Sequence, residues 1–259
     1  MFAPYLLNAW IAASFIAIAA GCAGFFVVLR RATFAAHALP LAAFPGAAAA
    51  SLFGFGEDYG LTGFALAGVA GLTWLKRGQR GDTATALVLV TLLGLGALFL
   101  SLSGNYGGAV EAMLFGQVLG IGSEDLFSAL AIGVGVPLAL LLCFRPLVLS
   151  AVSPALAATR GVACSWTDAF FLTVLALAAA FALPITGALL VFSLMVGPAA
   201  AARTLTRRPF AALGLSVGFA LAIIWAALAL AFLTDWPTGF FVGTLSAAGY
   251  LAARMLRGR

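Results

Sequence analysis

Few side chains in this sequence could do chemistry, and the one histidine, His37, stands out among them. A metalloprotease that works inside a membrane needs two histidines and a glutamate on one helix, and that spacing does not occur. Paired carboxylates within an apolar stretch are absent, as is the Gly-x-x-x-x-Gly-Lys-Ser/Thr loop that binds nucleotide phosphates. We therefore predict no catalytic residue, no bound cofactor and no enzyme activity in this chain.

His37 could instead bind a metal ion. Neutral imidazole suits zinc, whereas manganese prefers oxygen ligands. One imidazole, together with backbone carbonyls freed near Pro40 and Pro45, would make a weak site that releases its ion. The alternative is a structural histidine bonded to a backbone carbonyl. The residues alone leave both interpretations open.

The composition predicts an all-α, polytopic membrane protein that forms a single domain over residues 1–259. Hydrophobic residues make up 64% of the chain and charged residues 8%, whereas soluble domains are about 45–50% apolar and about 25% charged. A span needs roughly 20 apolar residues. Nine spans are predicted, with the break at Pro184 separating the sixth from the seventh. They cover about 5–29, 36–54, 60–75, 84–103, 126–144, 167–183, 185–202, 210–233 and 237–253.

The basic residues predict the orientation of these spans. All thirteen Lys and Arg fall at alternate span ends, and basic residues near span ends stay on the cytoplasmic side. The N-terminus is therefore expected outside, the C-terminus inside, and the number of crossings odd. The net charge of +5 needs no nucleic-acid partner, because anionic inner-leaflet lipid suffices. The clusters are 30–31, 76–80, 145, 160, 203–208 and 254–259.

Six of the eight acidic residues fall on the predicted outer side. Among them, Glu111, Glu124 and Asp125 lie within an outer connection, 104–125. They flank its apolar middle, 112–121, which is too short to cross and is expected to form a short helix or re-entrant piece. These three acids could receive ions or a delivering protein. An ordinary solvated rim explains them equally well.

The longest inner connection contains a segment suited to a short helix, Ser153 to Gly161. Ser153 is a good N-cap, Pro154 a good first helical residue, and Gly161 can end the helix. Ala157 and its neighbours favour helix between them. The segment lies where a cytoplasmic partner could dock, although a plain surface turn would have the same sequence.

Five segments together resemble a known family: 30–46, 111–125, 153–161, 187–202 and 235–239. In order and predicted topology they are similar to the permease subunit of bacterial manganese/zinc-type ABC importers, the ABC-3 family. The resemblance covers nearly the whole length. It implies that Ser153–Gly161 is a coupling helix that binds a separate ATPase.

The resemblance also implies a metal path, at which this chain departs from the family. His37 stands where the family has Asp, and Leu41 where it has His. Ser153 replaces an Asp of the inner loop and Ala155 a Glu. Within the most specific segment, Ser193 and Met195 could line the path, as could Met113 elsewhere, although helix packing explains each of them more simply.

The expected function is that of a membrane-spanning subunit of an ATP-driven importer in the bacterial inner membrane. Zinc is the first expected cargo, manganese the second and iron the third. A charged cargo needs an energy source, and because few ionisable groups lie within the spans, that source is expected to be a separate ATPase. Expected partners are an ATP-binding cassette ATPase, a periplasmic or lipid-anchored metal-binding protein, membrane lipid and a second copy of this chain. The alternatives are a secondary metal carrier and a non-transporting interaction subunit.

Overall fold

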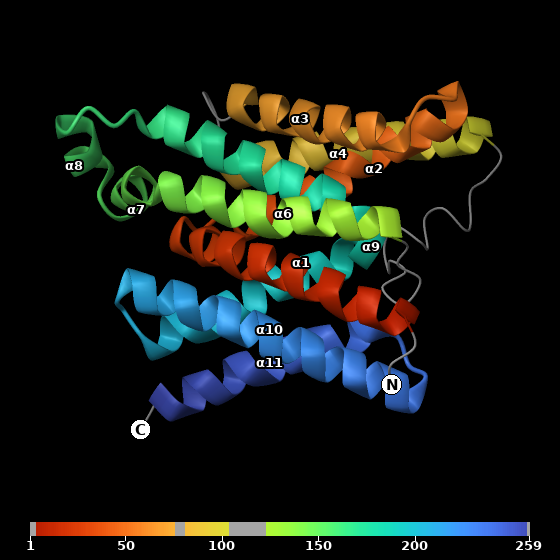
Figure 1. Ribbon diagram of the computed structural model, residues 1–259. Coiled ribbons are helices and arrows are strands. Elements are labelled where there is room, and N and C mark those ends of the chain that lie inside the picture. Colours follow the sequence, from red (N-terminus) through yellow and green to blue (C-terminus); the bar gives the residue numbers. More distant parts are fainter. Residues whose placement is uncertain (1–3, 76–80, 104–122, 258–259) are drawn as a thin grey trace.

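The protein is a bundle of helices that lie roughly side by side (Figure 1). The computed structural model describes residues 4–75, 81–103 and 123–257, and within these ranges every regular element is a helix. The predicted outer segment 104–125 falls almost wholly outside them. The helices are α1 (Pro4–Leu29), α2 (Thr33–Phe53), α3 (Glu57–Leu75), α4 (Gly81–Ser103), α6 (Ser123–Leu142), α7 (Phe144–Val152), α8 (Pro154–Thr159), α9 (Cys164–Leu205), α10 (Pro209–Thr234) and α11 (Thr238–Arg257).

Length and composition qualify six of the described helices as candidate membrane spans. A seventh is added if α6 and α7, which bend by 63° at their junction, are one broken span. The sequence predicted nine. The difference arises because α3 is not among the candidates and because α9, at 42 residues, counts once.

The long helix α9 consists of two legs that meet at Gly187. This residue has φ 74° and ψ 157°, a conformation open to glycine because it has no Cβ. The sequence placed the break at Pro184, which instead stays inside helical structure. Proline disturbs a helix only by removing one N–H and crowding one turn, whereas the backbone of Gly187 leaves the helical region altogether. We call residues 164–186 the first leg and 188–205 the second leg.

Both ends of α9 lie at the same end of the bundle. Asp168, near its start, pairs with Arg30 just beyond the end of α1. Its other end leads into α10, which runs antiparallel to α1: Ser216 bonds Gly21, and Trp225, further along α10, bonds the earlier residue Ser14. In Figure 1 the second leg accordingly returns toward the end where α8 lies. A straight 42-residue helix would instead be roughly 63 Å long, at 1.5 Å per residue, about twice the hydrocarbon thickness of a bilayer.

The helix α1 lies at the centre of one half of the bundle, where it packs against α6, α9 and α10. Around α2, the neighbours are α3, α4 and α9. The core is rich in alanine, with the large rings Phe25, Phe26 and Phe171 fully buried. Small residues let helix backbones approach closely where lipid offers no hydrophobic driving force for association.

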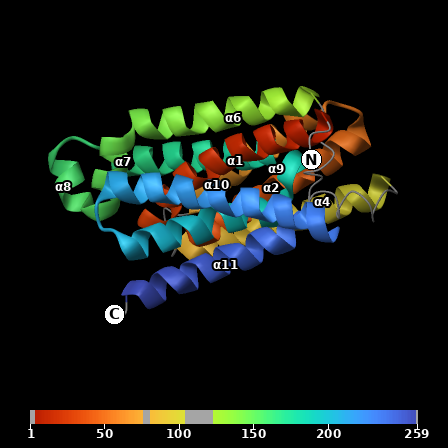
Figure 2. The same ribbon diagram turned by 60° about the horizontal axis from the view of Figure 1, so that its bottom comes forward.

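The described basic residues gather at one end of the bundle. Arg30 contacts α7 and the start of α9, while Arg207 and Arg257 line one surface pocket. Figure 2 shows α7, α8 and the C-terminal end of α11 at the end opposite the beginning of α1. Within residues 4–75, 81–103 and 123–257, the basic side chains therefore cluster at one end, as the sequence predicted.

The contact between α2 and α3 gives a test of this packing. A Cβ on Gly60 would lie 2.2 Å from the carbonyl oxygen of Gly46, whereas a Cβ on Gly63, three residues later, would meet nothing within 4 Å. We expect Gly60→Ala to lower stability by about 1–3 kcal/mol, because backbone must move to admit the methyl group. Gly63→Ala should be neutral or slightly stabilising.

Thermal unfolding of the two purified variants in detergent measures the difference. Equal melting temperatures for Gly60→Ala and Gly63→Ala would contradict the close α2–α3 contact.

Candidate functional site

His37 lies in the second turn of α2, half-buried, close to the end where the basic residues gather. Its imidazole packs edge-on against the ring of Phe192, with 4.7 Å between centroids and 63° between planes. Phe192 belongs to the second leg of α9, so the fold joins two segments that are far apart in sequence. Sequence analysis did not single out Phe192, because a lone aromatic residue in an apolar span has no diagnostic spacing.

The backbone beside His37 offers oxygen ligands. Pro40 and Pro45 both lie inside α2. Because proline has no N–H, the carbonyls four residues earlier, those of Ala36 and Leu41, lose their helical donors. Among the described residues, no three His, Cys, Asp or Glu side chains come together to hold a metal. A cluster of three such side chains is thus absent around His37 within the described residues, which leaves its imidazole and the neighbouring carbonyls as the candidate ligands.

The other two predicted path residues are placed differently from each other. Met195 is buried in the hydrophobic core, and its carbonyl oxygen faces Gly24 of α1. Ser193 is half-buried, and its hydroxyl donates to the Leu189 carbonyl at 2.9 Å. Its Oγ lies near Gly243 of α11, 3.9 Å from where a Cβ there would stand.

A further polar group, which the sequence did not suggest, lies beside the second leg. Ser246 of α11 is only 4% exposed, and its hydroxyl has no hydrogen-bond partner among the described residues. It faces Gly197, where an added Cβ would come within 2.5 Å of the Ser246 Cβ. Pro198 follows directly and frees the carbonyl of Leu194. The interface between the second leg and α11 therefore carries, among the described residues, a buried hydroxyl without a partner.

The segment Ser153–Gly161 forms the short helix α8, as the sequence predicted. The Ser153 hydroxyl accepts a hydrogen bond from the Leu156 N–H at 3.4 Å, and Pro154 takes the first helical position. At the other end Gly161 adopts φ 74°, and the N–H of Val162 donates to the Ala157 carbonyl at 2.9 Å. This is the left-handed cap that glycine favours.

The faces of α8 are unequal. Ala157 is fully buried against the rest of the chain, so it holds α8 in place and its methyl group is not available to a partner. Leu156 is 46% exposed, and Arg160 is exposed. A protein that binds α8 would meet these side chains.

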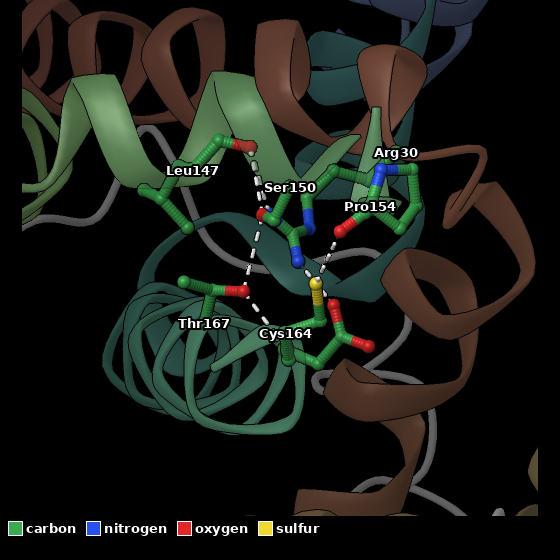
Figure 3. Close-up of polar contacts among 7 residues, drawn as sticks. Arg30, Leu147, Ser150, Pro154, Cys164 and Thr167 are labelled. Carbon is green, nitrogen blue, oxygen red and sulfur yellow. Dashed lines mark hydrogen bonds and ion pairs between the residues drawn. The ribbon is translucent and has the colours of Figure 1, made fainter. Parts of the chain in front are cut away.

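A polar network fixes the surroundings of α8 (Figure 3). The Arg30 guanidinium donates to the Leu147 carbonyl at 3.0 Å and to the Ser150 hydroxyl at 3.1 Å, both on α7. It also pairs with Asp168 in the first turns of α9 and lies 5.4 Å from the centre of the Phe171 ring. In the sequence, Arg30 gave only a topological signal, because its partners come from distant segments.

The predicted outer acids cannot be placed with the same detail. Glu111 lies outside the described residues. Glu124 and Asp125 belong to the first turn of α6, but their side chains also lie outside the description.

The sequence model of the ABC 3 transport family matches residues 3–257. The chain belongs to this family. Among similar curated proteins, a manganese import system permease protein, ScaB of Streptococcus parasanguinis, is 30% identical over 200 residues, covering 76% of this chain and 71% of the relative. A manganese transport system membrane protein, MntC of Halalkalibacterium halodurans, is 30% identical over 206 residues, covering 79% and 70%.

Similarity to a solved structure extends over nearly the whole fold. The structure of PsaBC from Streptococcus pneumoniae in complex with a Fab matches with a TM-score of 0.86, covering 97% of this chain and 91% of that chain. Sequence identity is 23%, so the match establishes a shared fold.

The positions at which this ABC 3 chain departs from the family resemblance can now be located. Leu41 is half-buried and packs on the hydrophobic core, so no second polar ligand stands one turn after His37. Ser153 caps α8, and serine and aspartate are about equally good N-caps. The N-cap of α8 is therefore kept although serine replaces the family's acidic residue. At the other position, Leu41 leaves His37 without the second polar residue of the family's pair.

Proposed function

We propose that this chain is the membrane-spanning subunit of an ATP-driven importer of a divalent transition metal ion in the bacterial inner membrane. The match of the ABC 3 transport family to residues 3–257 carries the proposal. Relatives over about three quarters of the chain are named for manganese import and manganese transport. The energy would come from ATP hydrolysed by a separate subunit.

The proposed topology has nine crossings, with the N-terminus outside and the C-terminus inside. This number counts each of the following as one crossing: α1, α2, α3, α4, α6, the two legs of α9, α10 and α11. The helix α3, with 19 residues, is roughly 28 Å long at 1.5 Å per residue, close to the thickness of the hydrocarbon core. The basic residues at one end of the bundle support an orientation with that end in the cytoplasm.

In the proposed mechanism, the ion passes His37 in a weakly bound, partly hydrated state. The half-buried imidazole and the freed carbonyls of α2 support this role. Imidazole suits zinc, which was the cargo expected from the sequence. The relatives give that preference no support, because their names specify manganese. Manganese is therefore the first cargo to test and zinc the second.

The proposed partners follow from the two ends of the bundle. An ATP-binding cassette ATPase would bind α8, whose exposed Leu156 and Arg160 stand at the basic end. A periplasmic or lipid-anchored binding protein would deliver the metal at the opposite end, where the acids Glu57, Asp58 and Asp235 lie. Two copies of the chain, paired about an axis normal to the membrane, would enclose one path, and inner-leaflet lipid would contact the basic residues.

Compartment reporters on the two termini test the topology. A reporter at the N-terminus is expected to be active outside the membrane, and one at the C-terminus in the cytoplasm, because an odd number of crossings separates them. A cytoplasmic N-terminal reporter would contradict nine crossings.

Metal uptake into proteoliposomes tests the path. We expect His37→Ala to cut uptake by roughly tenfold or more, since the site loses the one side-chain ligand proposed for it. The volume-conserving Leu41→Met, one turn away, should keep most of the uptake. The double change His37→Asp with Leu41→His restores the family's residue types. It should raise manganese uptake relative to that of the other metals in a panel.

Normal uptake by well-assembled His37→Ala would remove His37 from the path. Uptake by the wild-type chain without any ATPase would favour a secondary carrier instead.

Co-purification with the ATPase tests α8. Leu156→Asp should abolish or strongly weaken ATPase binding, because it places a charge in the centre of a packed contact. Leu256→Asp is the matched control: Leu256 is 68% exposed near the same end of the bundle, on α11. If both variants retain the ATPase equally, it binds elsewhere.

A further inference from the structure

Arg30 is a charged side chain held almost entirely inside the protein. Its side chain is 6% exposed, although it stands at the cytoplasmic end of α1. Burying a charge is costly unless it is paired and hydrogen-bonded. Arg30 meets this condition through Leu147 and Ser150 on α7 and Asp168 on α9. Its position is therefore fixed by two separate elements at once.

These two elements are the ones that carry α8. The chain passes from α7 into α8 at Ser153, which caps the end of one helix and the start of the other. It leaves α8 through Val162, bonded back to Ala157, and enters α9 at Cys164, whose sulfur lies 3.9 Å from the Pro154 carbonyl oxygen. Figure 3 shows the guanidinium of Arg30 between α7 and the start of α9. Thr167 closes the ring by donating to Ser150 at 3.1 Å.

From Arg30, α1 leads back to a close contact with the second leg of α9. Gly24, less than two turns earlier, lies so close to the second leg of α9 that a Cβ there would come within 1.9 Å of the Met195 carbonyl oxygen. One turn before Met195, Phe192 packs against His37. A shift of α1 therefore also moves the second leg, because two backbones in such close contact cannot move independently. Through Phe192 the shift reaches His37, the side chain proposed to touch the ion.

We propose that Arg30 is the positioning residue that transmits movement of α8 to α1 and so to the metal path. This inference rests on the proposed function, in which the ATPase binds α8. A guanidinium suits the task because its planar fork of donors can hold a carbonyl, a hydroxyl and a carboxylate in fixed directions, which a lysine ammonium does not do. Without it, α1 would be joined to α7 and the start of α9 mainly by apolar packing, such as that of Phe26 on Phe144 and Phe171, and would follow α8 less closely.

The test uses the complete complex of this chain with its ATPase in proteoliposomes. Three quantities are measured: ATPase co-purification, ATP hydrolysis, and manganese ions moved per ATP. Arg30→Met should keep the first two and lower the third by roughly tenfold, since two charge-assisted hydrogen bonds and an ion pair are lost. Arg30→Lys should restore only part of the ratio. Arg31→Met, at the exposed neighbouring residue, should match the wild type.

A second variant keeps the proposal testable if Arg30→Met fails to assemble. Asp168 is 54% exposed, so Asp168→Asn should fold normally and lower the ions moved per ATP by roughly threefold. An unchanged ratio in Asp168→Asn, or hydrolysis and uptake falling in parallel in either variant, would overturn the role of Arg30. Failure of the proposed function would look different, because the wild-type chain would then not bind the ATPase or would move no metal with it.

Discussion

The close contact of α1 with the helices around it is the constraint on which the rest of the structure depends. Gly21 and Gly24 leave no room for a side chain against α10 and the second leg of α9, respectively. In a bilayer, moving apolar surface from lipid into a helix–helix interface lowers the free energy little, because lipid tails are as apolar as the side chains. Helices therefore associate through dispersion and close approach of their backbones. The alanine-rich core serves this purpose, because small side chains let many helices share one neighbour.

Polar side chains then fix the rotation and register of the helices, which close packing alone does not determine. Ser216 donates to the Gly21 carbonyl at 2.7 Å, and Trp225 donates to Ser14 at 2.9 Å; both bonds join α10 to α1. Hydrogen bonds between membrane helices are modest individually, and they set rotation and register more than they add stability. The same logic applies at the end of the bundle where the basic residues gather, because the buried guanidinium of Arg30 bonds to α7 and α9 at once and restricts how α1, α7 and α9 are arranged.

The scarcity of ionisable groups also shapes the function. A site with many charged ligands would hold a divalent ion tightly and release it slowly. In the described residues, the surroundings of His37, where the path is proposed, contain one imidazole, freed carbonyls and a neighbouring aromatic ring. Under the proposed function, force from outside the spans would move the ion past this weak site. The arrangement of α8, Arg30 and α1 is the route proposed for that force.

The sequence by itself determined the all-helical membrane class, because composition and 20-residue apolar runs depend on the bilayer and not on the partner of any helix. It also determined α8, since an N-cap serine, a proline and a terminal glycine act within one short segment. Only the tertiary structure decided that α9 turns at Gly187 instead of Pro184, because a glycine adopts positive φ where its neighbours require it. Likewise, the contacts of His37 with Phe192 and of Arg30 with Asp168 join residues from distant segments. No local pattern specifies such pairs; the packing of whole helices brings them together.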